Sequence, residues 1–387
     1  MKSPNKITVQ ALLLTAALAV AYFGFTTVLQ VGQQYRVDGV THREAVLASK
    51  QRQSAPTSAS QQRWHRVWTL PVGAALAGAP AAWSNGLVVA AGKGTLLALD
   101  NTGSLRWRHT YSNLSFAGSP VVAGDVVVAA GSDGEVIACD LVTGQKIWQV
   151  KTESVGRHGP LAMRSDAGWQ VVLLSSANGV LRCLDARDGR ERWHSEPTNR
   201  SEGAPGAAGD VIAYGNCDSA VHLFDPSNGV QRAAVPLGEE AQMAGGVLVL
   251  NNRVYGGTRA GSLVCVDAVE NRVCWQVRLT DSEAFGTPVA AGDQLFMGTR
   301  DGHLSSVAAQ DGKLLWQVSL SNEVKSLCVV EDAVFVSAGG SLVGVRSRDG
   351  HVFQRLPVGD ELEGPVWNGR ILVVEVDGGN IVGFRGE

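Results

Sequence analysis

Several features that mark common classes of protein are missing from this chain of 387 residues. It contains no Cys-X-X-Cys pair, and its eight histidines show no metal-ligand spacing. No Gly-X-Ser-X-Gly or His-Glu-X-X-His sequence occurs, and the formal net charge is only −3. There is also no basic stretch interleaved with aromatic residues. These absences argue against a zinc or haem site, against the hydrolases that use those motifs, and against nucleic acid as a partner.

Cysteine is scarce and does not form the framework of a small disulfide-rich domain. The six cysteines are Cys139, Cys183, Cys217, Cys265, Cys274 and Cys328. Of these, Cys265 and Cys274 face each other across a predicted hairpin and could form a disulfide. The alternative is that both are small residues of the core.

Glycine is abundant, at 46 residues, and a pattern of Asp, Gly and Trp recurs along the chain. Its clearest copy, "ACDLVTGQKIW" from Ala138 to Trp148, predicts a hairpin whose turn needs an Asp side chain and a Gly with positive φ. The equivalent positions lie 41, 45, 40, 42, 41 and 38 residues apart, at Gly103, Gly144, Gly189, Gly229, Asn271, Gly312 and Gly350. Two further apolar runs precede each copy, so each repeat holds four short strands. This period predicts an all-β fold, the β-propeller.

The two ends of the chain predict how the propeller closes. The last repeat, "GPVWNGRILVVEVDGGNIVGFRGE", supplies three strands and ends where a fourth should begin. Near residue 68, "RWHRVWTL" reads as an outer strand with no blade before it. If this strand completes the last blade, the ring has eight four-stranded antiparallel blades and only short sheet edges.

We expect each blade to be fixed by one Trp, buried against the next blade, and by one Asp and one Gly in its turn. Burying each Trp would remove roughly 200 Å² from water, which is worth several kcal/mol at about 25 cal/mol per Å². The residues expected in these roles are Trp68, Trp107, Trp148, Trp193, Trp275 and Trp316, Asp100, Asp140, Asp185, Asp225 and Asp267, and Gly103, Gly144, Gly189, Gly229 and Gly312.

The Ala-X-Asp-X-X-Thr-Gly-X-X-X-Trp pattern resembles the tryptophan-docking motif of the pyrroloquinoline quinone (PQQ) repeat, over about residues 65 to 387. One branch of that family comprises quinoprotein dehydrogenases, and another comprises cofactor-free, BamB-like scaffolds with eight blades. The resemblance to the dehydrogenases implies adjacent cysteines beneath the cofactor, and this chain has no such pair. We therefore expect no cofactor, no metal and no enzymatic activity.

The N-terminus predicts a membrane anchor. The 25 residues from Ile7 to Val31 carry no charge, and as a helix they would be about 37 Å long, enough to cross a ~30 Å hydrocarbon core. Lys2 and Lys6 precede them, which places the short tail in the cytoplasm and the propeller in the periplasm. The alternative is a cleaved signal peptide, because Ala19 to Ala21 could form a cleavage site.

No cysteine precedes Cys139, so the lipid-attachment cysteine implied by the resemblance to BamB is missing. We therefore expect a single-pass protein of the bacterial inner membrane. Four regions are predicted: a cytoplasmic tail (1–6), the membrane anchor (7–31), a juxtamembrane helix and flexible linker (32–64), and the propeller (65–387). The linker includes the stretch from Ser54 to Gln62.

The loops that join one blade to the next all emerge on one face of a propeller. The early loops carry bases such as Arg157 and Arg200, and the later loops carry acids. The candidate partner-binding residues are Asp281, Glu283, Phe285, Glu323, Asp360, Glu361 and Glu363. A one-sided charge distribution would orient a complementary partner. The alternatives are that these loops are simply polar and that Phe285 packs between blades.

Together these features predict a non-catalytic scaffold that binds other envelope proteins as a subunit of a larger complex. Two alternatives remain: a quinoprotein-type dehydrogenase, and a sensor that binds a small molecule in the central funnel.

Overall fold

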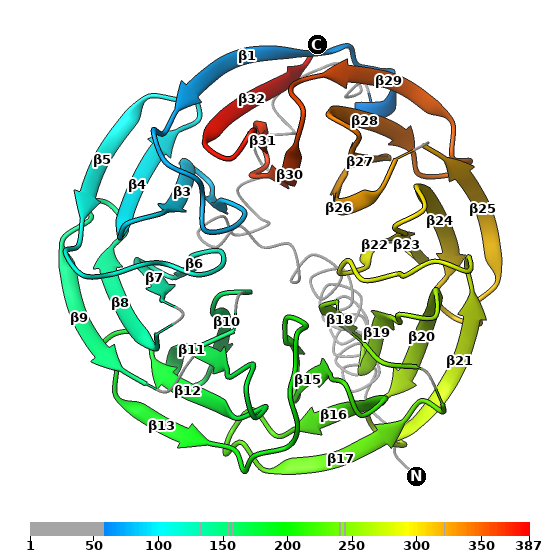
Figure 1. Cartoon of the computed structure of the whole chain (residues 1–387), viewed down its shortest axis with the longest axis horizontal. Helices are drawn as coiled ribbons and strands as arrows, with labels where there is room; N and C mark the ends of the chain where they lie inside the picture. The colour runs from blue at the N-terminus through cyan, green and yellow to red at the C-terminus, as the bar shows by residue number, and fades with distance from the viewer. Residues whose placement is uncertain are drawn as a thin grey trace, which may run out of the picture.

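A computed structural model describes residues 58–387, with the exception of Ser132, Glu153, Ser154, Arg157, Glu240, Ala244 and Ser321. The described residues form eight antiparallel sheets of four strands each, arranged around a central axis (Figure 1). The prediction of an all-β, eight-bladed propeller is confirmed. In this part of the chain no helix is both long enough and apolar enough to span a membrane. The predicted anchor at 7–31, the tail before it and residues 32–57 lie outside the described residues.

The blades are numbered along the chain. Blade 1 contains β2 to β5, each later blade takes the next four strands, and blade 8 contains β30, β31, β32 and β1. The innermost strands are β2 (Ala81–Trp83), β6 (Val121–Ala123), β10 (Leu161–Ser165), β14 (Gly206–Ala208), β18 (Val247–Leu250), β22 (Val289–Ala291), β26 (Val324–Val330) and β30 (Leu362–Trp367). The second strands are β3 (Gly86–Ala91), β7 (Val126–Ala130), β11 (Gly168–Leu174), β15 (Val211–Gly215), β19 (Arg253–Gly257), β23 (Gln294–Gly298), β27 (Ala333–Ala338) and β31 (Leu372–Val376).

The third strands are β4 (Thr95–Asp100), β8 (Glu135–Asp140), β12 (Leu181–Asp185), β16 (Ala220–Phe224), β20 (Ser262–Asp267), β24 (His303–Ala308), β28 (Ser341–Arg346) and β32 (Asn380–Gly386). The outer strands are β5 (Leu105–Thr110), β9 (Lys146–Lys151), β13 (Glu191–His194), β17 (Gln231–Pro236), β21 (Arg272–Arg278), β25 (Leu314–Ser319), β29 (Val352–Pro357) and β1 (Trp64–Pro71).

Burial explains the hydrophobic pattern of each strand. Every residue of β3 is buried, because both faces of a second strand pack against neighbouring blades. In the outer strand β5 only Trp107 is buried, and most other side chains are exposed. Continuous apolar runs therefore mark the middle of each blade, and a single Trp marks its outer edge.

Antiparallel pairing gives the ring two distinct ends. The turns from first to second strand and from third to outer strand lie at one end, which we call the turn face. The turns from second to third strand and the loops between blades lie at the other end, which we call the loop face. The recurring Asp and Gly are on the turn face, and the candidate partner-binding residues are on the side of the loop face.

The ring closes as predicted. Strand β1 runs antiparallel to β32, with Trp68 opposite Gly383, so the first strand of the propeller completes its last blade (Figure 1). Beyond these strands, the backbones of Arg63 and Glu387 exchange two hydrogen bonds of 2.9 and 3.2 Å. Residues from the two ends of the described chain thus share one sheet.

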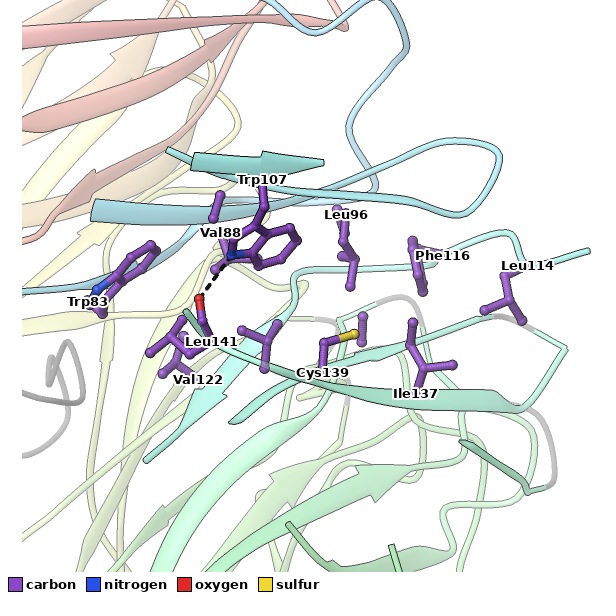
Figure 2. Close-up of a cluster of buried hydrophobic side chains, with 14 residues drawn as sticks. Trp83, Val88, Leu96, Trp107, Leu114, Phe116, Val122, Ile137, Cys139 and Leu141 are labelled. Atoms are coloured by element: carbon purple, nitrogen blue, oxygen red, sulfur yellow. Dashed lines mark hydrogen bonds between the residues drawn. The ribbon is translucent and has the colours of Figure 1, made fainter. Parts of the chain in front are cut away.

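The recurring Trp residues join each blade to the next. Their indole N–H groups donate to a carbonyl in the following turn, as Trp107 does to Leu141 in the cluster shown in Figure 2. The five donors are Trp107, Trp148, Trp193, Trp275 and Trp316, and their acceptors are Leu141, Ala186, Pro226, Ala309 and Ser347, at 3.0, 2.9, 3.0, 3.3 and 2.8 Å. Among the described residues, the buried indole nitrogen of Trp68 has no hydrogen-bond partner.

The recurring Gly has a second role that the sequence did not reveal. Gly189 has a φ of +73°, and a Cβ built on it would lie 2.7 Å from Trp148 of the preceding blade. The Gly therefore provides both the turn and the surface on which the Trp packs. Blade 4 has Ala233 where the Trp would stand, and the following turn has Asn271 in place of Gly, with a φ of +54°. Where no Trp packs, the turn still needs positive φ but tolerates a side chain.

The recurring Asp fixes the conformation of its own turn. The carboxylate of Asp140 accepts from the side chain and the backbone N–H of Thr143, at 2.8 and 2.7 Å. These hydrogen bonds hold the pKa of Asp140 below its usual range. Corresponding backbone contacts are made by Asp100, Asp185, Asp225 and Asp267.

Residues 58–62 differ from the expectation of a flexible linker. Ala59–Gln61 form a short 3-10 helix, and the backbone N–H groups of Ala59 and Ser60 donate to Glu331 and Asp332, both at 2.9 Å. The indole of Trp64 donates to the carbonyl of Ala59 at 3.0 Å. This segment is therefore bound to the turn face of blade 7.

Cys265 and Cys274, offered above as a disulfide pair, are both free thiols. Strands β20 and β21 pair Cys265 with Trp275 and Val266 with Val273, so a bulge leaves Cys274 without a direct partner across the sheet. Burial, and then the neighbouring Cys274, raise the pKa of the Cys265 thiol.

Candidate partner-binding face

The seven candidate partner-binding residues are spread along the loop-face side of blades 5 to 8. Asp281, Glu283 and Phe285 lie between β21 and β22, Glu323 between β25 and β26, Asp360 and Glu361 between β29 and β30, and Glu363 on β30. They do not form one cluster. Arg157 and Glu240, which also belong to these loops, lie outside the described residues.

Glu283 belongs to a row of alternating charges that crosses several blades, which we call the charged row. The row comprises Arg200, Glu202, Arg259, Glu283 and Arg300. Successive nitrogen–oxygen distances along it are 2.6, 2.9, 3.4 and 3.0 Å. Three of the members come from two inter-blade loops, and the other two come from turns within blades 5 and 6. Glu283 is therefore held between two guanidinium groups and is not an isolated acid.

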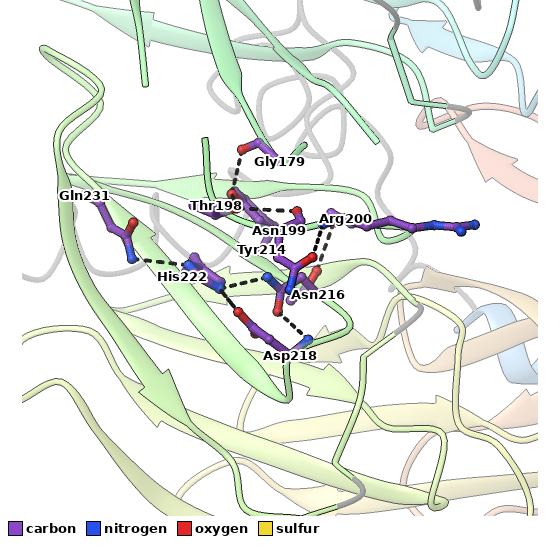
Figure 3. A network of polar contacts seen from close by, with 11 residues as sticks. Gly179, Thr198, Asn199, Arg200, Tyr214, Asn216, Asp218, His222 and Gln231 are labelled. Atoms are coloured by element: carbon purple, nitrogen blue, oxygen red, sulfur yellow. Dashed lines mark hydrogen bonds and ion pairs between the residues drawn. The ribbon is translucent and has the colours of Figure 1, made fainter. Parts of the chain in front are cut away.

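Buried polar contacts hold the first residue of the row in place (Figure 3). The hydroxyl of Tyr214 contacts that of Thr198 at 2.7 Å and donates to the carbonyl of Gly179 at 2.6 Å. The backbone N–H of Cys217 donates to the carbonyl of Arg200 at 3.3 Å. The side chain of Arg200 points away from this network (Figure 3), toward Glu202.

A buried histidine supports the adjacent turn of blade 4. His222 is stacked on Tyr214, with 5.4 Å between ring centroids, and its Nε2 lies 2.9 Å from Asn216 and 3.2 Å from Asp218. Gln231 contacts the other ring nitrogen at 3.2 Å. These contacts account for His222 as a structural residue beneath the loop face.

Arg259 and Arg300 were not among the candidates predicted from the sequence, which were drawn from the loops between blades. Both residues lie in second-to-third strand turns, in "GGTRAG" and "MGTRDG", where each Arg follows Gly-Thr. Because these turns share the loop face with the inter-blade loops, they bring bases among the acids. The repeated Gly-Thr-Arg was the clue available in the sequence.

Acids do gather near blade 8. The backbone N–H groups of Asp360 and Glu361 donate to the carboxylate of Asp377, at 2.8 and 3.0 Å. Both Asp360 and Glu361 are exposed. Glu363 lies 3.9 Å from Lys325. We call Asp360, Glu361, Glu363 and Asp377 the acidic patch.

Glu375 lies beneath the acidic patch and is buried. It stands opposite Glu363 across strands β31 and β30, and its Oε1 accepts from the backbone N–H of Leu76 at 3.3 Å. Burial, together with the charge of Glu363, raises the pKa of Glu375 to about 7. Leu76 belongs to the connection from β1 to β2, so this contact links blade 8 to blade 1.

Phe285 is half-buried in its loop. Its carbonyl lies against Gly245, where an added Cβ would meet it closer than 3.0 Å. The backbone of Phe285 is thus packed on the preceding inter-blade loop, while part of its side chain remains accessible on the loop face.

The chemistry of this face is ionic. Within the described ranges no group of three or more His, Cys, Asp or Glu residues could hold a metal ion. The charged row and the acidic patch instead offer a partner alternating charges over blades 3 to 6 and negative charge at blade 8. Such surfaces contribute to orientation and association rate more than to affinity.

Eight four-stranded blades, joined by Trp side chains that pack on turn glycines, define the class of PQQ-like β-propellers. The family model described as outer membrane protein assembly factor BamB matches residues 57–211, 143–232 and 177–382. The chain therefore belongs to this family.

Curated relatives carry the same description. The BamB of Burkholderia pseudomallei is 24% identical over 243 residues, which cover 59% of this chain and 61% of the relative. The BamB of Bordetella pertussis is 27% identical over 252 residues, which cover 59% of this chain and 62% of the relative. The alignments thus span less than two thirds of the length of these relatives.

Solved structures share the fold. BamB from Moraxella catarrhalis superposes with a TM-score of 0.71 at 17% identity, covering 84% of this chain and 100% of that one. The computationally designed Ika8 protein gives a TM-score of 0.72 at 17% identity, covering 83% of this chain and 99% of that one. Because a designed propeller fits equally well, this similarity establishes the fold alone.

Proposed function

We propose that this protein is a non-catalytic scaffold of the bacterial cell envelope, which binds partner proteins through its loop face as a subunit of a larger complex. The proposal rests on the charged row, because five side chains from two inter-blade loops and two turns converge on one continuous surface. Membership in a family named for outer membrane protein assembly supports it. The partner's docking surface carries positive charge where it meets the acidic patch.

The anchor is a separate part of the proposal. The uncharged stretch from Ile7 to Val31 holds the protein in the inner membrane, and the propeller lies in the periplasm. The lysines before this stretch and the absence of a cysteine before Cys139 support this arrangement. Ser58–Gln62 are bound to the turn face of blade 7, so the described part of the chain begins on this face.

Site-specific crosslinking tests the binding face. A photo-reactive residue is placed at Phe285 or Glu361 on the loop face, and at Val142 on the turn face as the matched control, because Val142 is 73% exposed. Full-length protein is irradiated in intact cells, purified from detergent-solubilised membranes and analysed by mass spectrometry. The proposal expects one set of envelope proteins to be captured from both loop-face positions. Capture from Val142 alone would move the binding surface to the turn face.

A fractionation experiment tests the anchor. The intact mass of the mature protein distinguishes a retained anchor from a cleaved signal peptide, and carbonate extraction distinguishes an integral from a peripheral protein. We expect an uncleaved chain that resists extraction. A mature chain that begins after Ala21 would contradict the inner-membrane anchor and leave the loop-face proposal standing.

A further inference from the structure

Blade 3 departs from the repeat in one place. Its spacing, from Gly144 to Gly189, is 45 residues and is the longest in the chain. The extra residues lie in the hairpin between β10 and β11: Leu161 pairs with Val172, a separation of 11, whereas the corresponding separation from Val121 to Val128 in blade 2 is 7.

The added residues project from the turn face. In blade 2 the second strand begins at the residue opposite the motif Asp, where Val126 pairs with Asp140. In blade 3 the residue opposite Asp185 is Gln170, and β11 begins two residues earlier. Two further cross-strand pairs, Arg164 with Trp169 and Ser165 with Gly168, therefore extend past the edge of the blade. We call residues 164–169 the hairpin extension.

The hairpin extension presents an unpaired guanidinium group. Arg164 is exposed, and its Cζ lies 5.8 Å from the centroid of the Trp169 ring. In the described part of the chain, no hydrogen-bond acceptor or carboxylate contacts this guanidinium. Trp169 is itself fixed, because its carbonyl accepts from Ala186 at 3.1 Å and its ring lies against Gly124, where a Cβ would be 2.7 Å from Cδ1. Stacking thus holds the guanidinium while its donors remain free.

The central channel opens beside this group. A cavity of about 1060 Å³ reaches from the inner strands to the hairpin extension. Its walls combine apolar residues of the inner strands, such as Val122, Leu161 and Val247, with polar residues that include Arg164, Ser165 and Asp166 of the hairpin extension. Arg192 also lines it but is already paired with Asp185. The cavity slightly exceeds the ~300–1,000 Å³ of typical small-ligand sites.

We propose that the mouth of the channel on the turn face binds an extended polypeptide segment of a partner protein. The segment places apolar side chains against the inner strands and a carboxylate, from an acidic side chain or a chain end, on Arg164. A guanidinium fork matches the geometry of a carboxylate, and one unpaired cation beside the apolar residues of the inner strands suits a peptide with one acid next to apolar residues. This site lies on the face opposite the charged row, so the loop-face proposal can fail without affecting it.

Peptide selection tests the proposal. Full-length protein in detergent is used to select eight-residue peptides from a random phage library, and the affinity of an enriched peptide is measured by fluorescence anisotropy. We expect enriched peptides with an acid beside apolar residues. In the selected peptide, replacing the acid by its amide should weaken binding roughly tenfold or more, as expected for loss of a charge-assisted hydrogen bond.

Two arginine variants locate the binding group. Arg164→Gln should weaken binding of the selected peptide by a similar factor. Arg190→Gln is the matched control, because its side chain is 85% exposed on a turn of the same blade, and it should change affinity less than twofold. Both variants are checked for an unchanged melting temperature. Failure to enrich any peptide, enrichment of peptides without an acid, or equal affinity of the Arg164→Gln variant would each overturn the proposal.

Discussion

At the scale of the residue, the Asp, Gly and Trp of each repeat act across a blade boundary. The Gly of one turn accommodates the Trp of the preceding blade, so a substitution there has two costs: strain at positive φ and overlap with an indole ring. At the boundary between blades 4 and 5, Ala233 stands at the Trp position and Asn271 at the Gly position. This contact explains why the two residues of the motif are replaced together.

Two glycine substitutions distinguish the cost of backbone strain from the cost of overlap with the indole ring. Gly189→Ala should destabilise the propeller by about 2–5 kcal/mol, from roughly 1–2 kcal/mol of backbone strain and roughly 1–3 kcal/mol of overpacking. Gly292→Ala is the control, because Gly292 has a φ of +60° but no atom within 4 Å of an added Cβ. This variant should be destabilised by the backbone strain alone. Urea unfolding of the two variants measures the difference. Equal losses would mean that the Trp moves away without cost.

The indole hydrogen bond can be tested in the same way. Trp148→Phe removes the donor to Ala186 and leaves that carbonyl unpaired, whereas Trp68→Phe removes a buried N–H that has no partner in the described structure. Trp148→Phe should therefore be the more destabilising by about 1 kcal/mol or more. Thermal unfolding compares them. A larger loss for Trp68→Phe would show that its indole nitrogen is satisfied in solution.

At the scale of the element, closure depends on more than the pairing of β1 with β32. The contact of Glu375 with Leu76 joins blade 8 to the connection that leads into blade 1, and the segment from Ser58 to Gln62 joins β1 to blade 7. The first contact involves a buried acid beside Glu363, so it should depend on pH.

The pKa of Glu375 is raised from 4.5 to about 7, so the folded protein binds a proton more tightly than the unfolded chain does. The stabilisation from this group is complete below about pH 4.5 and is lost as the pH rises through 7. Glu375→Gln keeps an acceptor for Leu76 and should melt a few degrees above the wild type at about pH 8, with a smaller difference at about pH 5. Glu361→Gln, an exposed neighbour, is the control. A Glu375→Gln variant with unchanged pH dependence would contradict this assignment.

The sequence predicts the elements well and the contacts between them less well. The period of the repeat and the positions of its Trp residues are enough to predict eight blades and a closing strand that contains Trp68, because each repeat carries the same local pattern. The ion pairs of Arg259 and Arg300 and the anchoring of Ser60 by Asp332 could not be predicted in this way, since they join residues far apart in the chain. The longer spacing of blade 3 was visible, but its location in the β10–β11 hairpin required the strand register.

At the scale of the whole molecule, the two faces differ in charge and construction. The loop face carries the charged row, in which Glu202 and Glu283 are already paired with arginines, and the acidic patch, in which Asp360 and Glu361 are exposed. An incoming basic surface should therefore be attracted mainly to the patch, because the acids of the row are already neutralised by their neighbours.

This difference leads to a kinetic prediction for the partner captured by loop-face crosslinking. The triple variant Asp360→Asn, Glu361→Gln and Glu363→Gln should slow association roughly tenfold at low salt and flatten its dependence on ionic strength, because long-range attraction acts before contact. The control neutralises three exposed acids of the turn face, Asp125, Asp188 and Asp293, and should leave the rate unchanged. Surface-based kinetic measurements over a salt series, with melting temperatures of both variants, compare the two. If both variants slow association equally, net charge rather than the acidic patch steers the partner, and the loop-face docking site would have to rest on the charged row alone.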